Sequence, residues 1–254
     1  MNNRVKKATF NKNAFEIAAW NTQSVVVGID EVGRGCLAGP VVAAAVILPV
    51  NKDSRHLKDS KLMTHEERLK AYTWIAKHCH IGIGIIHNRI VDQHNIWQAT
   101  LIAMKKALVN LLAMSPHTPS AILIDAMPLN LSDTSYKDIP VHYFPQGERK
   151  SSSIAAASIV AKVTRDRMMD LFNLVIPGYN LCENKGYATK AHKLAIKNTI
   201  HSIIHRTSFL NKTLSHQSNQ QGQQLLLDFT NQAEESSYKG AVHNEKGNIL
   251  CRSD

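Results

Sequence analysis

The feature that most constrains this chain is the apolar run of residues 25–29, which ends in two adjacent carboxylates, Asp30 and Glu31. A run of this length, rich in β-branched residues, predicts a buried strand. Carboxylates at the end of a buried strand are costly to desolvate unless a cation or hydrogen bonds meet them. The loop Gly33-Arg34-Gly35 follows, combining a closely approachable backbone with one permanently charged donor. This combination predicts metal-dependent phosphodiester chemistry, and a strand followed by an ordinary polar turn is the alternative.

Four more apolar runs predict strands, and four further segments have helical spacing or are rich in alanine. The run 121–125 resembles the first one because it also ends in a carboxylate, Asp125. The expected strands are 25–30, 41–48, 81–87, 121–125 and 141–144, and the expected helices are 14–20, 62–78, 92–112 and 152–174. Residues 179–212 also have a helical pattern, rich in Lys and His. This order of elements predicts an α/β fold with mixed strand pairing.

The two carboxylate-terminated strands carry the candidate chemistry. If they are neighbours in the sheet, Asp30 and Asp125 face each other at the same sheet edge. Two carboxylates placed in this way repel each other, and are expected to be protonated or bound to a metal. Carboxylate oxygens are hard ligands, which favour Mg²⁺ or Mn²⁺ over zinc.

The charge of the chain is unevenly distributed along its 254 residues, a length that can bury one sizeable core with a small appended lobe. Residues 213–254 contain three Lys or Arg and five Asp or Glu, whereas the other 212 residues contain 27 and 15. A body this basic favours a polyanionic partner, because neutralised phosphates release counterions. Beyond Lys212 the composition shifts to Gln, Ser and Asn, which predicts a disordered tail.

Cysteine usage and hydropathy bear on the compartment. The four cysteines include no CxxC pair, so the sequence predicts neither a zinc knuckle nor a disulfide framework. No run of about 18 apolar residues occurs, and the charged N-terminus is not followed by the apolar stretch of a signal peptide. We therefore expect a cytoplasmic protein that does not bind membranes.

One string in the chain resembles the first motif of ribonuclease HII, namely Gly28-Ile29-Asp30-Glu31-Val32-Gly33-Arg34-Gly35. Residues 36–48 then continue as that family does. Further similar strings are Leu57–Lys61, Ala156–Asp166, Asn184–His192 and His205–Phe209. The resemblance, from about Val25 to Phe209, implies a ribonuclease-H-like mixed sheet flanked by helices, with a small helical C-terminal lobe. The expected regions are an N-terminal extension (1–23), a catalytic domain (24–175), the helical lobe (176–212) and the tail (213–254).

The resemblance also implies the catalytic and metal-binding acids, an Asp-Glu-Asp-Asp set in this family. Asp30, Glu31 and Asp125 match its first three members. The fourth position aligns with Glu148, one methylene longer than the family's aspartate, which leaves the choice between Mg²⁺ and Mn²⁺ open. Asp166 is the rival for that position. Two bound divalent ions would activate a water and stabilise the departing oxygen.

The implied activity is endonucleolytic cleavage of the RNA strand of RNA–DNA hybrids, and of the 5′ side of single ribonucleotides embedded in duplex DNA. The products would carry a 3′-hydroxyl and a 5′-phosphate. The Gly33-Arg34-Gly35 loop would read the 2′-hydroxyl, and the ring of Tyr187 would pack on the sugar of the following deoxynucleotide. Lys61 and Arg206 are candidate phosphate contacts. The alternatives are a hybrid ribonuclease without junction specificity and a non-catalytic nucleic-acid-binding relative.

One apolar patch stands in the polar tail, Gln224-Leu225-Leu226-Leu227-Asp228-Phe229. It resembles the short peptides by which bacterial replication and repair proteins dock on the sliding clamp. Docking would place these apolar side chains in a pocket of the partner. A short helix that packs back on the catalytic body is the alternative.

Overall fold

The computed structural model describes residues 12–51, 57 and 60–210. The side chain of Lys61 and the predicted clamp-binding segment Gln224–Phe229 lie outside the described residues. Contacts divide the chain into one compact unit, Met1–Arg206, and a second, Thr207–Asp254, of which only Thr207–Leu210 are described. None of the helices in the described ranges combines the length and apolar character that a membrane crossing needs.

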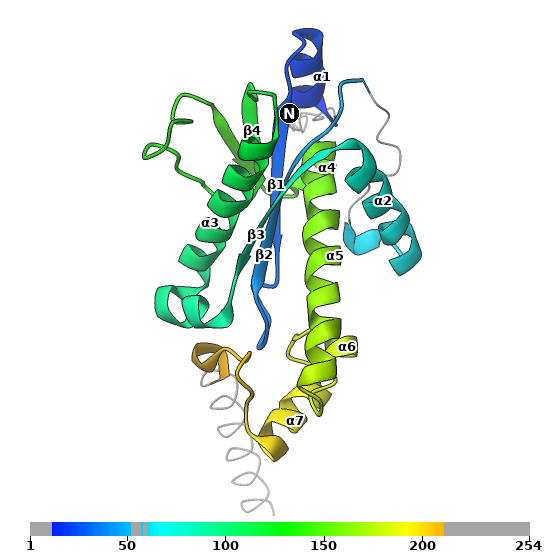
Figure 1. Cartoon of the computed structure of the whole chain (residues 1–254), viewed down its shortest axis with the longest axis vertical. Coiled ribbons are helices and arrows are strands. Elements are labelled where there is room, and N and C mark those ends of the chain that lie inside the picture. The colour runs from blue at the N-terminus through cyan, green and yellow to red at the C-terminus, as the bar shows by residue number, and fades with distance from the viewer. Residues whose placement is uncertain (1–11, 52–56, 58–59, 211–254) are drawn as a thin grey trace, which may run out of the picture. The chain divides into compact units, whose positions relative to one another are not determined.

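A five-stranded mixed sheet forms the centre of the first unit, in the order β3-β2-β1-β4-β5 (Figure 1). Strand β1 is antiparallel to β2 and parallel to β4, while β3 is antiparallel to β2 and β5 is parallel to β4. The bounds are Val26–Val32 (β1), Val41–Ile47 (β2), His80–Ile86 (β3), Ala121–Asp125 (β4) and Val141–Phe144 (β5). The predicted mixed sheet flanked by helices is confirmed.

The register of β1 and β4 brings the two carboxylate-terminated strands together. Ile29 pairs with Ile124, so Asp30 and Asp125 are the next residues along two neighbouring parallel strands. Asp30 itself pairs with Ala44 on β2. The two acids therefore lie side by side in the middle of the sheet, as expected if these strands were neighbours.

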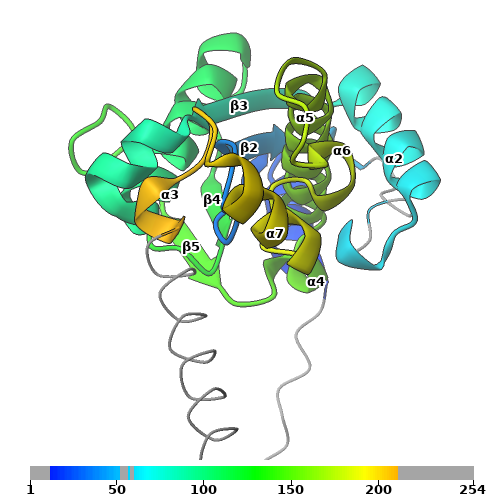
Figure 2. The same cartoon turned by 90° about the horizontal axis from the view of Figure 1, so that it is seen from below.

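Helices cover both faces of the sheet (Figure 2). Helix α3 (Asn88–Met114) lies on one face, and α5 (Ser152–Val175) and α2 (His65–His78) lie on the other. Two glycines allow this close approach: a Cβ at Gly28 would lie 2.1 Å from the carbonyl carbon of Ser153 on α5, and one at Gly84 would lie 2.0 Å from the carbonyl oxygen of Ala103 on α3. Because no real side chain tolerates such distances, these glycines let both helices rest directly on the sheet.

Residues at the N-terminus of the described chain hold the start of α5. In α1 (Ala14–Asn21), the fully buried Glu16 accepts the backbone N–H of Ser153 at 3.0 Å, and Asn13, just before α1, accepts that of Ser152 at 2.8 Å. These bonds satisfy donors that the first turn of a helix leaves without intrahelical partners. A carboxylate at this end also interacts favourably with the helix dipole. Helix α1 therefore fixes where α5 begins.

Several boundaries differ from the expected ones for local reasons. Helix α2 begins three residues later than predicted, because Thr64 and Glu67 form a capping box. Helix α3 begins at Asn88 rather than residue 92 and is interrupted at Asn95, whose φ is 65°. The side-chain oxygen of Asn95 accepts the backbone N–H of Gln98 at 3.1 Å and caps the second part of α3.

The segment predicted to be helical over 179–212 contains two short helices in its described part, α6 (Leu181–Asn184) and α7 (Lys190–Thr199). Two further short elements were not predicted, η1 (Ser60–Leu62) and α4 (Gly147–Lys150). Helix α4 matters for the site because it carries Glu148. The predicted domain boundaries stay predictions.

Candidate functional site

Three carboxylates lie around one buried acid, Asp30 on β1. Only 5% of Asp30 is exposed. Burial raises the pKa of Asp30 well above its ordinary value, and the negative charges of Glu31, Asp125 and Glu148 raise it further. The other three acids that the sequence singled out are therefore close enough to Asp30 to interact with it electrostatically. A carboxyl group in such surroundings favours either a proton or a bound cation.

Two serines position the fourth acid, Glu148. The hydroxyl of Ser158 on α5 donates to Glu148 Oε1, and the hydroxyl of Ser60 donates to the same oxygen at 3.4 Å. The two hydroxyl oxygens lie 2.8 Å apart, so the single proton of Ser60 is shared between Ser158 Oγ and Glu148 Oε1. Ser158 also acts to lower the pKa of Asp30, so it lies between the acid on α4 and the acid on β1. Sequence reasoning missed both serines, although each lies in a string that it had singled out.

Asp125 is held by the same short helix that carries Glu148. Its Oδ1 accepts the backbone N–H of Gly147 at 2.8 Å. A Cβ at Gly147 would lie 3.2 Å from that oxygen, so the absence of a side chain helps the backbone to reach the carboxylate. Helix α4 thus joins the end of β4 to the start of α5.

Glu31 lies between the acids and the predicted substrate loop. Its Oε1 accepts from Arg34 Nη1 at 3.3 Å, whereas its Oε2 is buried without a hydrogen-bond partner. Burial raises the pKa of Glu31, although the Arg34 guanidinium acts in the opposite direction. The guanidinium carbon of Arg34 also lies 6.0 Å from the ring centroid of Trp97 on α3. The arginine of the Gly33-Arg34-Gly35 loop is therefore placed by an acid and an indole.

Asp166, the rival for the fourth position, lies in different surroundings. Its Oδ1 accepts from Lys162 Nζ at 2.8 Å, four residues earlier on α5. Glu148 is among the charges that raise the pKa of Asp30. The structure therefore brings Glu148 to the acids around Asp30, and it pairs Asp166 with a lysine that lines the same hollow.

Arg206 was predicted to contact phosphate, but its guanidinium is fully buried. It donates to the backbone carbonyl of Arg34 at 2.9 Å, and from two nitrogens to that of Gly39. The side chain has no exposed surface for a phosphate, so its place in the structure corrects the prediction of a direct contact. Arg206 instead braces the Gly33-Arg34-Gly35 loop from behind.

Tyr187 lies in the same hollow as three of the acids, and 40% of its surface is exposed. Lys162 Nζ lies 5.8 Å from its ring centroid. That hollow, of about 480 Å³, contains both residues together with three of the acids. Its lining consists of Asp30, Glu31, Val32, Ser60, Arg68, Asp125, Ser158, Lys162 and Tyr187.

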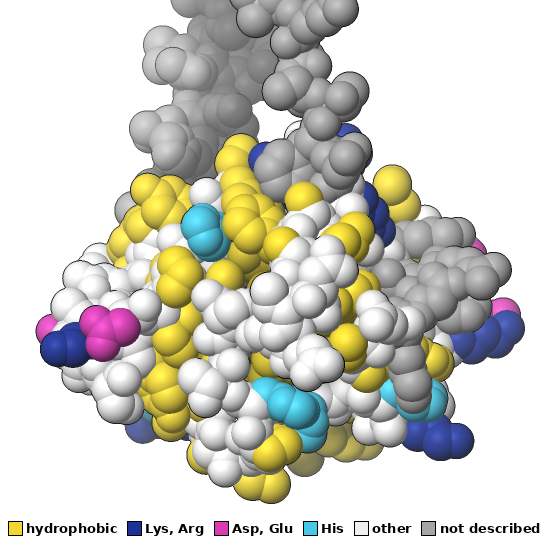
Figure 3. Space-filling view, turned by 90° about the horizontal axis from the view of Figure 1, so that it is seen from above, with side chains coloured by type: hydrophobic (Ala, Val, Ile, Leu, Met, Phe, Trp, Pro, Cys, Tyr) yellow, Lys and Arg dark blue, Asp and Glu magenta, His cyan; other side chains and the backbone are white. Residues whose placement is uncertain are grey.

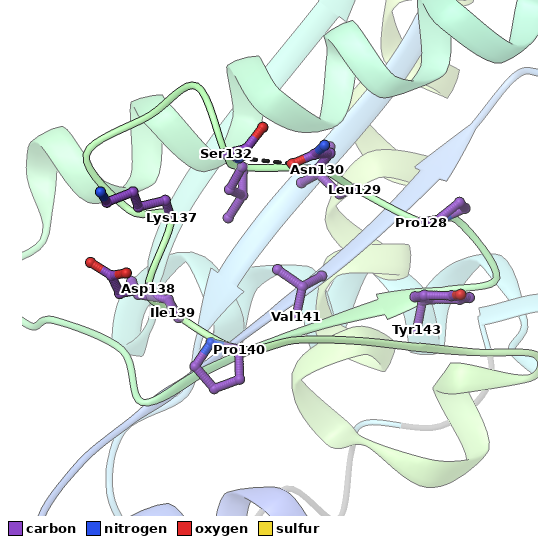
Figure 4. Close-up of a pocket in the computed structure, with 11 residues that line it drawn as sticks. Pro128, Leu129, Asn130, Ser132, Lys137, Asp138, Ile139, Pro140, Val141 and Tyr143 are labelled. Atoms are coloured by element: carbon purple, nitrogen blue, oxygen red, sulfur yellow. Dashed lines mark hydrogen bonds between the residues drawn. The ribbon is translucent and has the colours of Figure 1, made fainter.

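A second hollow, of about 590 Å³, lies between residues 128–132 and 137–143 (Figure 4). Its charged side chains are Lys137 and Asp138, and none of the predicted site residues lines it. The surface at the α1 end of the molecule shows charged side chains mainly along its rim (Figure 3). We place the candidate site in the smaller hollow, because three of the acids and Tyr187 meet there.

The donor set fits a hard divalent cation such as Mg²⁺ or Mn²⁺, since it consists of carboxylate and hydroxyl oxygens. The buried Oε2 of Glu31 is an acceptor that no protein group fills. Within the described part of the chain, there is no ready-made group of three His, Cys, Asp or Glu side chains around a metal position.

Comparisons with known proteins agree on one family. A family model described as Ribonuclease HII matches residues 27–212. Ribonuclease HII of Listeria monocytogenes serotype 4b (strain F2365) is 46% identical over 185 residues, covering 72% of this chain and 67% of that protein.

Solved structures show the same fold. The PCNA:RNase HII complex from Archaeoglobus fulgidus matches with a TM-score of 0.61 at 23% identity, covering 72% of this chain and 94% of that one. Bst-RNase HIII in complex with Mn²⁺ matches with a TM-score of 0.56 at 21% identity, covering 79% and 73%. At these identities the likeness concerns the fold alone.

Proposed function

The chain belongs to the ribonuclease HII family, and we propose that it is a metal-dependent endoribonuclease with two kinds of substrate. It cuts the RNA strand of RNA–DNA hybrids, and it cuts duplex DNA on the 5′ side of single embedded ribonucleotides. The observation that carries this proposal is the meeting of three of the acids and the exposed ring of Tyr187 in one hollow. That hollow offers carboxylates for a metal beside a surface for a sugar.

Asp30, Glu31, Asp125 and Glu148 would hold the divalent ions, Mg²⁺ or Mn²⁺. Two ions, when bound, supply an acidified water as nucleophile and stabilise the charge on the departing 3′-oxygen. Ser158 and Ser60 keep Glu148 oriented by hydrogen bonds, and the backbone N–H of Gly147 does so for Asp125. The protein therefore needs no separate general base, and the products carry a 3′-hydroxyl and a 5′-phosphate.

Substrate choice is assigned to the loop and the tyrosine on either side of the acids. The Gly33-Arg34-Gly35 loop reads the 2′-hydroxyl, the sugar atom that distinguishes RNA from DNA. Tyr187 packs on the next sugar, where a second 2′-hydroxyl would not fit. The buried Arg206 supports this assignment, because it holds the carbonyl of Arg34 in place. Lys162, which lines the hollow beside the Tyr187 ring, is a candidate contact for an adjacent phosphate.

Cleavage of a DNA duplex with one embedded ribonucleotide, compared with a uniform hybrid, tests this proposal. The protein should cut both with Mg²⁺ or Mn²⁺. Tyr187→Ala should lower kcat/KM for the single-ribonucleotide duplex about tenfold more than for the hybrid, because the sugar contact is needed only at the junction. Tyr187→Phe, which keeps the ring, is the matched control and should retain the preference.

Two outcomes would favour the alternatives. Cleavage of the hybrid without cleavage of the single-ribonucleotide duplex would indicate a hybrid ribonuclease that ignores the junction. Tight binding of the hybrid without cleavage in either metal would indicate a non-catalytic nucleic-acid-binding relative.

The sliding clamp is the second proposed partner, through Gln224–Phe229. Its support is the apolar patch in a polar tail, together with the structure of an Archaeoglobus fulgidus relative as a PCNA:RNase HII complex. Deleting residues 213–254 should abolish capture by the clamp in a pull-down and leave cleavage of a short duplex unchanged. The full chain carrying Leu227→Ala and Phe229→Ala should behave like the deletion. Loss of basal activity or of thermal stability on deletion would instead indicate a segment that packs on the catalytic body.

A further inference from the structure

We propose that His192 and His205 form a neutral hydrogen-bonded pair that positions Tyr187 relative to the Gly33-Arg34-Gly35 loop, and thereby sets recognition of the ribonucleotide junction. Neither histidine lines the hollow that contains the acids. The inference rests on the proposed function and deepens it, because it concerns how the two substrate-reading segments are held together. Both residues act through others and are positioning residues.

The hydrogen bonds of the pair determine where its protons lie. His192 Nδ1 is 2.8 Å from the carbonyl oxygen of Tyr187, and His205 Nδ1 is 3.0 Å from the backbone nitrogen of Ser202. The two Nε2 atoms are 3.0 Å apart. A carbonyl oxygen only accepts and a backbone N–H only donates, so His192 carries its proton on Nδ1 and His205 carries its proton on Nε2. The His205 Nε2–H therefore donates to His192 Nε2, and each ring is neutral.

Burial favours the neutral forms that this arrangement requires. His192 is 0% exposed and His205 is 2% exposed, and the ring of Tyr179 packs against both. Burial lowers the pKa of both histidines. For His205, His192 lowers it further and His201 adds a small effect, so that the pKa of His205 is about 4. A second proton on either ring would turn one of these accepting nitrogens into a donor. The pair is thus a fixed link at neutral pH.

The link joins the two segments that read the substrate. On one side, His192 holds the carbonyl of Tyr187. On the other side, His205 forms a β-bridge with Ala38, and the next residue, Arg206, donates to the carbonyl of Arg34. The backbone N–H of Arg206 also donates to the carbonyl of Leu37 at 2.8 Å. The backbone N–H groups of Leu37 and Ala38 also donate to the carbonyl of Gly186, at 2.8 and 3.3 Å. Breaking the imidazole–imidazole bond therefore loosens the hold on the Tyr187 carbonyl, while these backbone bonds keep the two segments together.

Kinetics on the two substrates test the proposal. His192→Ala should raise KM for the single-ribonucleotide duplex about tenfold, the effect of leaving one buried hydrogen-bonding group unsatisfied, with little change in kcat. KM for the uniform hybrid should change much less. His205→Ala should act alike, and the double variant should be no worse than either single one, because both remove the same link. His205→Gln, whose amide can still donate to His192, should recover much of the preference.

Tyr179→Phe is the matched control for a loss of stability. It removes the hydroxyl that donates to the carbonyl of Ile200 but leaves the ring on the histidines. It should lower thermal stability without changing the ratio of the two KM values. Equal changes in that ratio for Tyr179→Phe and His192→Ala would overturn the proposal, because both would then act through stability.

A measurement independent of activity is the ¹⁵N spectrum of the imidazoles. The wild-type protein should show one Nδ1–H ring and one Nε2–H ring, and both should titrate below the ordinary range of a histidine. Two rings of the same tautomer, or one that titrates near its ordinary pKa, would refute the pair even if the enzyme is active. Conversely, absence of any cleavage of embedded ribonucleotides by the wild type would refute the proposed function and leave the spectrum as the test of the pair.

Discussion

Asp30→Asn is expected to abolish cleavage and, at the same time, to stabilise the protein in the absence of divalent ions. Loss of a metal-holding carboxylate removes several kcal/mol of transition-state stabilisation, which corresponds to a fall in kcat of about 10³-fold. The stability gain follows from the raised pKa of Asp30, which reflects a charge held in a buried site beside three other acids. Asparagine has nearly the same shape without the charge.

The pH dependence of stability has a definite sign for this group. Because the pKa of Asp30 in the folded protein lies above its unfolded value, the folded protein binds the proton more tightly. The stabilisation is complete below the unfolded pKa of about 3.9 and is lost as pH rises through the folded pKa. Glu31, whose pKa is also raised, contributes in the same direction. Asp30→Asn removes the part of this loss that comes from Asp30.

Thermal unfolding with and without Mg²⁺ measures both effects alongside a cleavage assay. The wild type should gain stability on adding the metal, because a ligand that binds only the folded state stabilises it, and Asp30→Asn should gain much less. Asp170→Asn is the matched control, since its side chain is half-exposed on α5 and pairs with Lys185. Full activity of Asp30→Asn, or of the equivalent change at Asp125, would remove the metal-based mechanism.

Glu148→Gln should lower kcat about 10²- to 10³-fold, because the neutral amide cannot serve as an anionic metal ligand. Glu148→Asp should keep activity within about tenfold, since the charge is retained. Asp166→Asn should have a smaller effect than Glu148→Gln, because Asp166 pairs with Lys162 on α5, whereas Glu148 is among the charges that raise the pKa of Asp30. Steady-state kinetics of the three variants at saturating Mg²⁺ and Mn²⁺ make the comparison.

The reverse order of sensitivities would show that Asp166 is the fourth ligand. In that case the bonds from Ser158 and Ser60 to Glu148 would serve only to join α4 to α5. Circular dichroism of each variant separates a loss of ligand from a loss of fold.

The sequence by itself determined which segments form the strands, because burial leaves a local signature, whereas the neighbours of each strand were implied by the order of elements and by the family resemblance. The strands 121–125 and 141–144 have the expected bounds, and β1 continues two residues beyond its expected end at Asp30. A run of β-branched residues reports that a segment is buried, and this holds whichever strand lies beside it. The predicted start of α2 was three residues early, because a helix start depends on a single capping residue. Here that residue is Thr64, and its capping box with Glu67 can be found in the sequence.

Asp30 and Asp125 were found by the same local logic, since a carboxylate that ends a buried run needs a partner, whereas Glu148 was implied only by the family resemblance. Periodicity does not reveal that partner. The bond from Ser158 to Glu148, and the pairing of His192 with His205, depend on how α5 and α7 pack against the rest of the first unit.

Arg206 shows most clearly what only the tertiary structure decided. In the sequence it is one of many basic residues in a basic chain, and a phosphate contact is the natural expectation. In the structure its guanidinium points inward and binds the carbonyl of Arg34, 172 positions away. Composition measures how much positive charge a chain carries. The direction in which one side chain points follows from which unpaired carbonyls the folded backbone leaves within its reach, and these exist only once the segments have packed together.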